Sequence, residues 1–138
     1  MEKVRNTLAI FGLLILISIF VGCSTDININ DYINKQAPLE LHIRQTELTA
    51  LTDSTNNLRL AVNSEKYNKL VQWGNENTKG WQSTPASYIT EIYVSQGDFR
   101  LLYTPGIKGV VIGFKDKKGK PRQYSKTTEI GELDFLAK

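Results

Sequence analysis

The sequence predicts an α+β fold in which an antiparallel sheet of five or six strands, arranged as a meander, carries one helix on one face. Leu39–Gln45 alternates apolar and polar side chains, which is the period of a strand with one buried face. An apolar stripe with helical spacing begins at Tyr67. After Pro85, short β-branched and aromatic runs alternate with glycine-containing turns, and this pattern is typical of an antiparallel meander.

The chain opens with a segment that has the layout of a secretory signal peptide. Lys3 and Arg5 give a cationic start, Leu8–Val21 is almost wholly apolar, and the small residue Gly22 follows. A charged start, an apolar run and a small residue at the cleavage point are the three regions of such a peptide. We therefore expect residues 1–22 to be a leader that is removed on export.

The only cysteine of the chain, Cys23, comes directly after this leader. Phe20-Val21-Gly22-Cys23 resembles the lipobox of bacterial lipoproteins, with Phe20 where leucine is usual. The resemblance covers residues 1–23 alone. It implies that the Cys23 sulfur receives a diacylglyceryl group and that Cys23 becomes the N-terminus. Two alternatives remain: the apolar run is an uncleaved transmembrane helix, or Cys23 is a buried thiol.

The same resemblance implies an exported protein that is anchored to a membrane by lipid. Several acyl chains hold a protein on a membrane stably, whereas a single chain binds only reversibly. In a Gram-negative host, Ser24 rather than aspartate after the cysteine favours the outer membrane, with the domain facing the periplasm.

Residues 23–38 are expected to be the lipidated cysteine and a flexible tether, because this stretch is largely polar and ends with a proline. The alternative is that Ile27, Ile29 and Ile33 fold back onto the domain. Residues 39–138 are expected to form a single globular domain. Removal of the leader leaves 116 residues, enough to bury a core without disulfides.

Within this domain, the strand at 39–45 is expected to pair with residues 57–62 through a turn at 52–57. Ser64 is the expected N-cap of a helix that Gly80 closes, and Trp81 is expected to fill the gap between the helix and the sheet. Four more strands are expected at 88–94, 99–103, 109–114 and 122–126, with turns at Gly97, Gly106 and Gly119. Leu133, Phe135 and Leu136 are expected to close against this meander.

The residue types exclude several kinds of chemistry. His42 is the only histidine and Cys23 the only cysteine, so we expect no structural metal, no cofactor and no Cys-His catalytic site. The glycines match no phosphate-binding loop. We therefore expect that the protein is not an enzyme. The alternative is a small hydrolase, because two catalytic carboxylates can be far apart in the sequence and come together only in the folded chain.

Charge and aromatic residues point to two candidate surfaces. Arg100–Lys126 holds eight basic residues against Asp116 alone, in a chain of net charge +3. Its most polar part is expected to be a hairpin tip, either simply solvated or in contact with lipid head groups, wall polymer or an acidic protein; its basic residues are Lys115, Lys117, Lys118, Lys120 and Arg122. Trp73 and Trp81 are expected to be either core residues or an aromatic binding surface.

These observations predict a lipid-anchored envelope protein that acts by binding or as a structural component. Its expected partners are the membrane, through the anchor, and a protein or an anionic envelope component. The alternative is a periplasmic immunity protein that neutralises a toxin by covering it. Nucleic acid also suits the charge, but an exported location argues against it.

Overall fold

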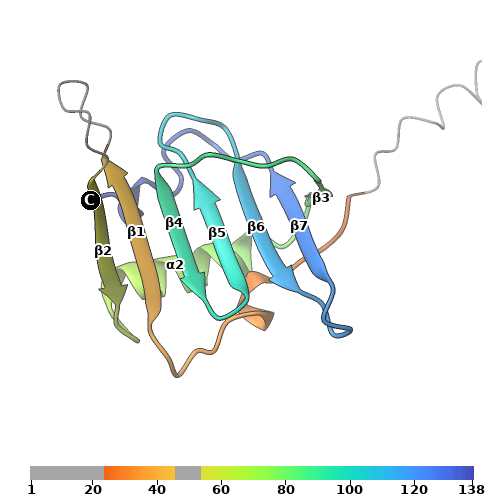
Figure 1. Ribbon diagram of the computed structural model, residues 1–138, viewed down its shortest axis with the longest axis horizontal. Helices are drawn as coiled ribbons and strands as arrows, with labels where there is room; N and C mark the ends of the chain where they lie inside the picture. Colours follow the sequence, from red (N-terminus) through yellow and green to blue (C-terminus); the bar gives the residue numbers. More distant parts are fainter. Residues whose placement is uncertain (1–23, 46–53) are drawn as a thin grey trace, which may run out of the picture.

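Over the residues that the structure describes, the chain forms a seven-stranded antiparallel sheet with one α-helix against one face (Figure 1). The computed structural model describes residues 24–45 and 54–138. The strand order is β2-β1-β4-β5-β6-β7-β3. The strands are β1 (Leu39–Gln45), β2 (Ser54–Leu60), β3 (Gln82–Ser83), β4 (Ile92–Gln96), β5 (Phe99–Tyr103), β6 (Val110–Lys115) and β7 (Pro121–Lys126), and the helices are α2 (Glu65–Glu76) and the 3-10 turns η2 (Ile29–Asp31) and η3 (Asp134–Leu136).

The α+β class is confirmed, and the sheet is larger than the expected five or six strands. The additional strand, β3, has two residues, which is too short to produce an alternating pattern. The strand expected at 88–94 begins only at Ile92. Ile89, which was expected inside it, is 89% exposed. The turn expected at 52–57 is partly strand, because β2 begins at Ser54, and the rest of it lies outside the described residues.

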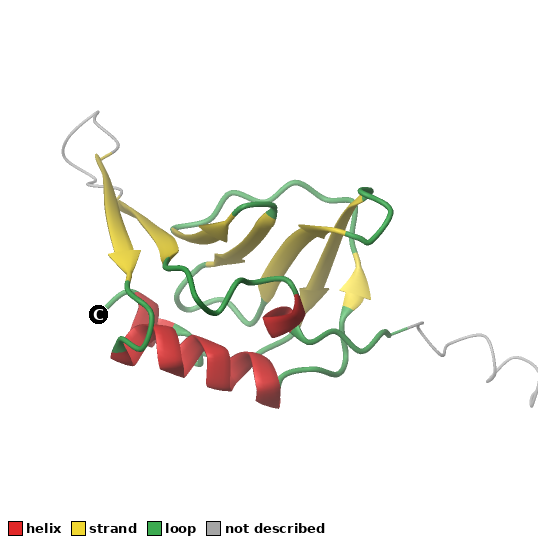
Figure 2. Cartoon of the chain, turned by 90° about the horizontal axis from the view of Figure 1, so that it is seen from below, coloured by secondary structure: helices red, strands yellow, loops and turns green. Residues whose placement is uncertain are grey.

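Figure 2 shows from below that α2 lies against one face of the sheet, and the buried side chains of the core come from both. Each central strand contributes alternate side chains to it; Leu41, Val94, Leu101 and Ile112 are fully buried. The helix contributes its predicted stripe, with Leu70 fully buried at its centre. Ser64 caps the helix as expected, since its hydroxyl accepts a hydrogen bond from the Tyr67 amide at 3.4 Å.

The prediction that residues 24–38 form a flexible tether is wrong, and the fold-back alternative is what the structure shows. Ile27, Ile29 and Ile33 are 7%, 1% and 8% exposed and belong to the core. Asn30 fixes this segment to the helix, because its side-chain amide donates to the Val71 carbonyl at 2.9 Å and to Asn75 Oδ1 at 2.8 Å. Three isoleucines are therefore enough to anchor this otherwise largely polar segment in the core.

The helix is shaped to receive this segment at one glycine. A Cβ added at Gly74 would come within 2.5 Å of Ile29 Cγ1, so only glycine allows the observed approach of Ile29 to α2. The N-terminal segment and the helix are therefore matched by packing as well as by hydrogen bonds.

The connection between β3 and β4 crosses the outer face of the sheet, the face opposite α2 (Figures 1 and 2). Gln123 holds it there, because its side-chain amide donates to the carbonyls of Thr84 at 3.3 Å and Ala86 at 2.5 Å. We call residues 84–91 the crossing segment. It gives one part of the outer face a partial cover and leaves the rest open.

The C-terminal residues close the core, as expected from the sequence. Leu133 and Leu136 are fully buried. Tyr103 donates a hydrogen bond to Asp134 Oδ1 at 2.7 Å, and burial together with this bond raises the pKa of Tyr103 to about 12. Among the described residues, no helix has the length and apolar character needed to span a membrane.

Replacing Ile29 by alanine tests whether the N-terminal segment belongs to the core. Removing a fully buried isoleucine side chain should lower the free energy of unfolding by about 2–5 kcal/mol. The matched control is Ile130→Ala, because Ile130 is 61% exposed. This substitution should change the free energy of unfolding by less than about 0.5 kcal/mol. Denaturant unfolding measures the stability of both variants. Equally small losses of stability would show that residues 24–33 do not belong to the core.

Candidate functional site

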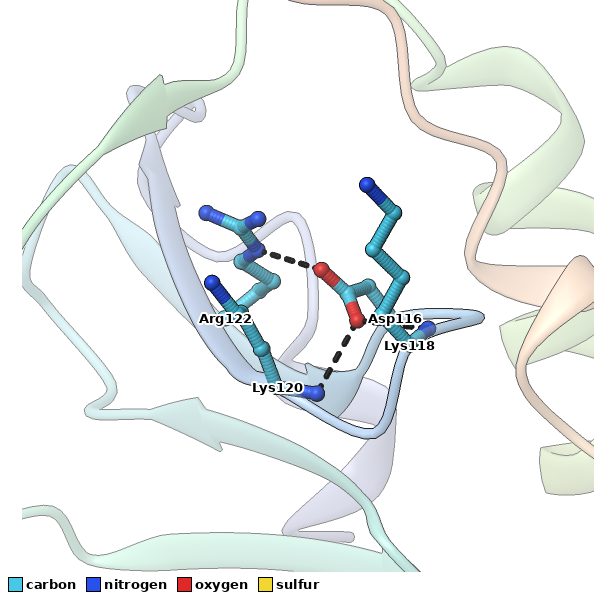
Figure 3. Close-up of polar contacts among 4 residues, drawn as sticks. All are labelled: Asp116, Lys118, Lys120 and Arg122. Carbon is cyan, nitrogen blue, oxygen red and sulfur yellow. Dashed lines mark hydrogen bonds and ion pairs between the residues drawn. The ribbon is translucent and has the colours of Figure 1, made fainter.

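The hairpin between β6 and β7 has a turn whose shape is fixed by Asp116 (Figure 3). Asp116 Oδ1 accepts hydrogen bonds from the backbone amides of Lys118 and Lys120, both at 2.9 Å, and Oδ2 accepts one from Arg122 Nε at 2.8 Å. Gly119 completes the turn in the left-handed region, with φ 75°. The tip of this hairpin is therefore held by its own residues.

These contacts keep Asp116 ionised. The backbone amide of Lys120, followed by the Arg122 guanidinium, lowers the pKa of the Asp116 carboxyl. A lowered pKa in the folded state means that the carboxylate favours the folded turn at neutral pH, and that this preference is lost as the pH falls through that pKa.

The five predicted basic residues meet on this hairpin but differ in their partners. Lys115 Nζ pairs with Asp98 Oδ1 at 2.8 Å, and Arg122 pairs with Asp116. The other three, Lys117, Lys118 and Lys120, are exposed, and no ion pair is found for their side chains within the part of the chain that the structure describes. We call these three residues the lysine tip.

An aromatic stack supports the base of the hairpin. The rings of Tyr32 and Phe114 are 3.7 Å apart at 22°, and those of Phe114 and Tyr124 are 5.8 Å apart at 14°. Burial, with a contribution from the nearby Asp31 charge, raises the pKa of Tyr32. Sequence reasoning missed Tyr32, because it lies in the segment that we expected to be a tether; an aromatic residue among spaced isoleucines was the available signal.

Trp73 and Trp81 lie in the core, so of the two alternatives stated for them the core alternative holds and the binding surface is not formed. They are 5% and 0% exposed, and their rings meet edge to face at 6.3 Å and 87°. Each indole N–H has a partner inside the protein: Trp73 donates to Glu132 Oε1 at 2.7 Å, and Trp81 donates to the Asn77 carbonyl at 2.9 Å.

His42 lies half-buried on β1 and is engaged locally. Its Nδ1 is 2.6 Å from Asn57 Oδ1, and its ring centroid is 5.5 Å from that of Tyr93. Within residues 24–45 and 54–138, no group of three or more His, Cys, Asp or Glu side chains is placed to hold a metal ion. Cys23, the predicted lipidation site, lies outside the described residues.

A hollow of about 550 Å³ is a feature that sequence reasoning missed. Its walls come from the crossing segment, the turn between β5 and β6, the ends of β6 and β7, and the two residues Gly80 and Gln82 that flank Trp81. These segments are far apart in the sequence, so no local pattern signals the cavity. Its volume is within the range of small-ligand sites, roughly 300–1,000 Å³.

The lining of the hollow combines apolar, neutral polar and cationic side chains. None of its residues is Asp or Glu, and it includes Lys108 and Lys126. Lys126 Nζ donates to the Lys79 carbonyl at 2.6 Å. Two apolar side chains of its rim stand out into solvent, since Ile89 is 89% exposed and Ile107 is 57% exposed.

The hollow and the lysine tip lie at opposite ends of β6 and β7. Val110 pairs with Lys126 at the hollow, and Lys115 pairs with Pro121 at the hairpin. Five residue steps along a strand separate these two pairs by about 17 Å. The protein therefore has two distinct candidate surfaces.

Comparison with protein-family models, with curated proteins and with solved structures finds no match to this chain. Inferences about its function therefore rest on its own residues and their geometry.

Tryptophan fluorescence tests the buried position of both indoles, because the chain has two tryptophans and no others. Emission of the folded chain should lie at shorter wavelength than that of the unfolded chain, and iodide should quench it weakly. A third tryptophan placed by Ile89→Trp, at a residue 89% exposed, should add a strongly quenched component. Equal quenching of folded and unfolded wild-type chains would contradict the buried arrangement.

Proposed function

We propose that this chain is a lipid-anchored, exported protein of the cell envelope that acts by binding and not by catalysis. Cys23 carries the anchor, on the strength of the lipobox-like Phe20-Val21-Gly22-Cys23. The lysine tip binds an anionic component of the envelope.

The observation that carries the binding role is the turn held by Asp116. Two backbone amides and the Arg122 guanidinium bind this carboxylate, so the turn is ordered before any partner arrives. A preformed surface loses less conformational freedom on binding, and three exposed positive charges on it attract an anionic partner over a distance of about a Debye length, about 8–10 Å.

The position of the lysine tip relative to the anchor supports the same role. Thr25 and Trp81 exchange two backbone hydrogen bonds, of 2.8 and 3.2 Å. Trp81 precedes Gln82, which pairs with Ser125 near the end of β7 that is remote from the hairpin. Cys23 is only two residues before Thr25, so the proposed anchor attaches near one end of β7, and the lysine tip is at the other end.

Replacing Cys23 by serine tests the anchor. The variant has no sulfur to acylate, so it should remain as an unprocessed precursor and should incorporate no labelled fatty acid. Ser24→Ala is the matched control and should be processed and labelled like the wild type. Labelling and processing of the Cys23→Ser variant at wild-type levels would refute the lipoprotein assignment.

Charge reversal tests the lysine tip. The variant Lys117→Glu with Lys118→Glu should lose capture of its partner from the host's envelope fraction, and wild-type capture should weaken steeply with salt. Thermal stability should change little, since exposed substitutions are usually within about 0.5 kcal/mol. Lys69→Glu with Lys138→Glu changes the net charge equally at exposed positions away from the hairpin and should keep the partner.

The identity of the captured partner separates two roles of this surface. A wall polymer favours a structural role in the envelope. A single acidic protein favours neutralisation of a toxin, as an immunity protein does. Retention of the partner by the Lys117→Glu, Lys118→Glu variant would show that the hairpin is only a solvated turn.

A further inference from the structure

The chain has at most a very short spacer between the proposed anchor at Cys23 and the first hydrogen bonds of the domain, which begin at Thr25. Thr25 is bridged to Trp81 by backbone hydrogen bonds, and the Ile27 amide donates to the Thr78 carbonyl at 2.7 Å. Two residue steps of extended chain reach at most about 7 Å. A lipid on Cys23 therefore holds Thr25, and the domain behind it, at the membrane surface.

The part of the domain that lies beside this bridge is the hollow. Gly80 and Gln82, the neighbours of Trp81 in the chain, both line it. Lys126, which also lines it, donates to the carbonyl of Lys79, the residue next to Gly80. The bridge that fixes the anchor and the wall of the hollow are thus made from the same short stretch, residues 79–82.

The rim of the hollow has the side chains of a membrane-contacting surface. Ile89 on the crossing segment and Ile107 on the turn between β5 and β6 are 89% and 57% exposed, although a side chain of this type is most often buried. Ile107 is followed by Lys108, and no lining residue is acidic. Apolar side chains beside basic ones are the composition of surfaces that rest in the head-group region of anionic membranes.

We propose that the rim of the hollow docks on the membrane, with Ile89 and Ile107 in the boundary between head groups and acyl chains and Lys108 against lipid phosphates. This docking rests on the proposed lipid anchor at Cys23. It orients the domain so that the lysine tip, at the other end of β6 and β7, faces away from the bilayer. An anchor at Cys23 holds the neighbouring edge of the domain at the bilayer, and the lining carries lysines and no acidic residue; for these two reasons the membrane is the occupant.

Single-cysteine labelling of the full, processed chain in vesicles of phosphatidylethanolamine and phosphatidylglycerol tests this orientation. Ile89→Cys, Ile107→Cys and Lys118→Cys each receive an environment-sensitive fluorophore in detergent, before reconstitution. Cys23 is the only native cysteine, and its acylated sulfur does not react, so the wild-type chain serves as the blank. All three positions are exposed, and tryptophan emission confirms that each variant is folded.

The labels at 89 and 107 should emit at shorter wavelength and should be quenched by the neutral quencher acrylamide at least several-fold less than the label at 118. Equal quenching at the three positions, with an unlabelled wild type, would overturn the docking proposal and leave the anchor intact. Labelling of the wild type would instead contradict the anchor, and with it both proposals.

Charge reversal at the rim supplies the second measurement. Lys108→Glu should increase acrylamide quenching of the label at 107, because a carboxylate is repelled by phosphatidylglycerol. The matched control Lys117→Glu, with the same change of charge at the far end of β6 and β7, should leave that quenching unchanged. Equal effects of the two reversals would contradict a contact between Lys108 and lipid phosphates.

Discussion

The attachment of the N-terminal segment to the edge of the sheet is the constraint on which the arrangement of this molecule depends. Two backbone hydrogen bonds join Thr25 to Trp81, and a third joins Ile27 to Thr78. Behind them, Ile29 packs against Gly74 of α2, and Asn30 bonds the helix backbone. Because these contacts begin two residues after Cys23, the domain starts where the predicted anchor ends. Any lipid on Cys23 therefore holds one defined edge of the sheet close to the membrane.

This constraint divides the surface into two ends with different physical character. Near the attachment, the rim of the hollow combines exposed isoleucines with Lys108 and has no acidic lining residue. At the other end of β6 and β7, Asp116 organises a turn that presents three exposed lysines. The first surface suits a membrane and the second an anionic partner. A single strand pair therefore separates the two proposed contacts by a fixed distance.

The elements with strong periodic patterns were predictable from the sequence, and the features that bring distant segments together were not. Leu39–Gln45, the stripe on α2 and the turn-rich meander each carry a local signal, and the structure has all three. The basic hairpin was predictable as well, since its residues are contiguous. The burial of Ile29 depends on a glycine 45 positions away, and the crossing segment that carries Ile89 is held at Ala86 by Gln123, on a distant strand. The positions of Trp73 and Trp81 were ambiguous, because helical spacing alone does not distinguish a core face from a binding face. In the structure, Glu132 and the Asn77 carbonyl accept hydrogen bonds from the two indole N–H groups, so both indoles can be buried.

Hydrogen exchange at individual amides tests the attachment of the N-terminal segment most directly. In the folded chain, the amides of Thr25 and Ile27 donate to Trp81 and Thr78, so they should exchange as slowly as amides in β7 and should lose this protection together with α2 when denaturant is added. Exchange of these two amides at the rate of an unstructured peptide, while α2 and the sheet remain protected, would show that the segment is a free tether and that the anchor does not orient the domain.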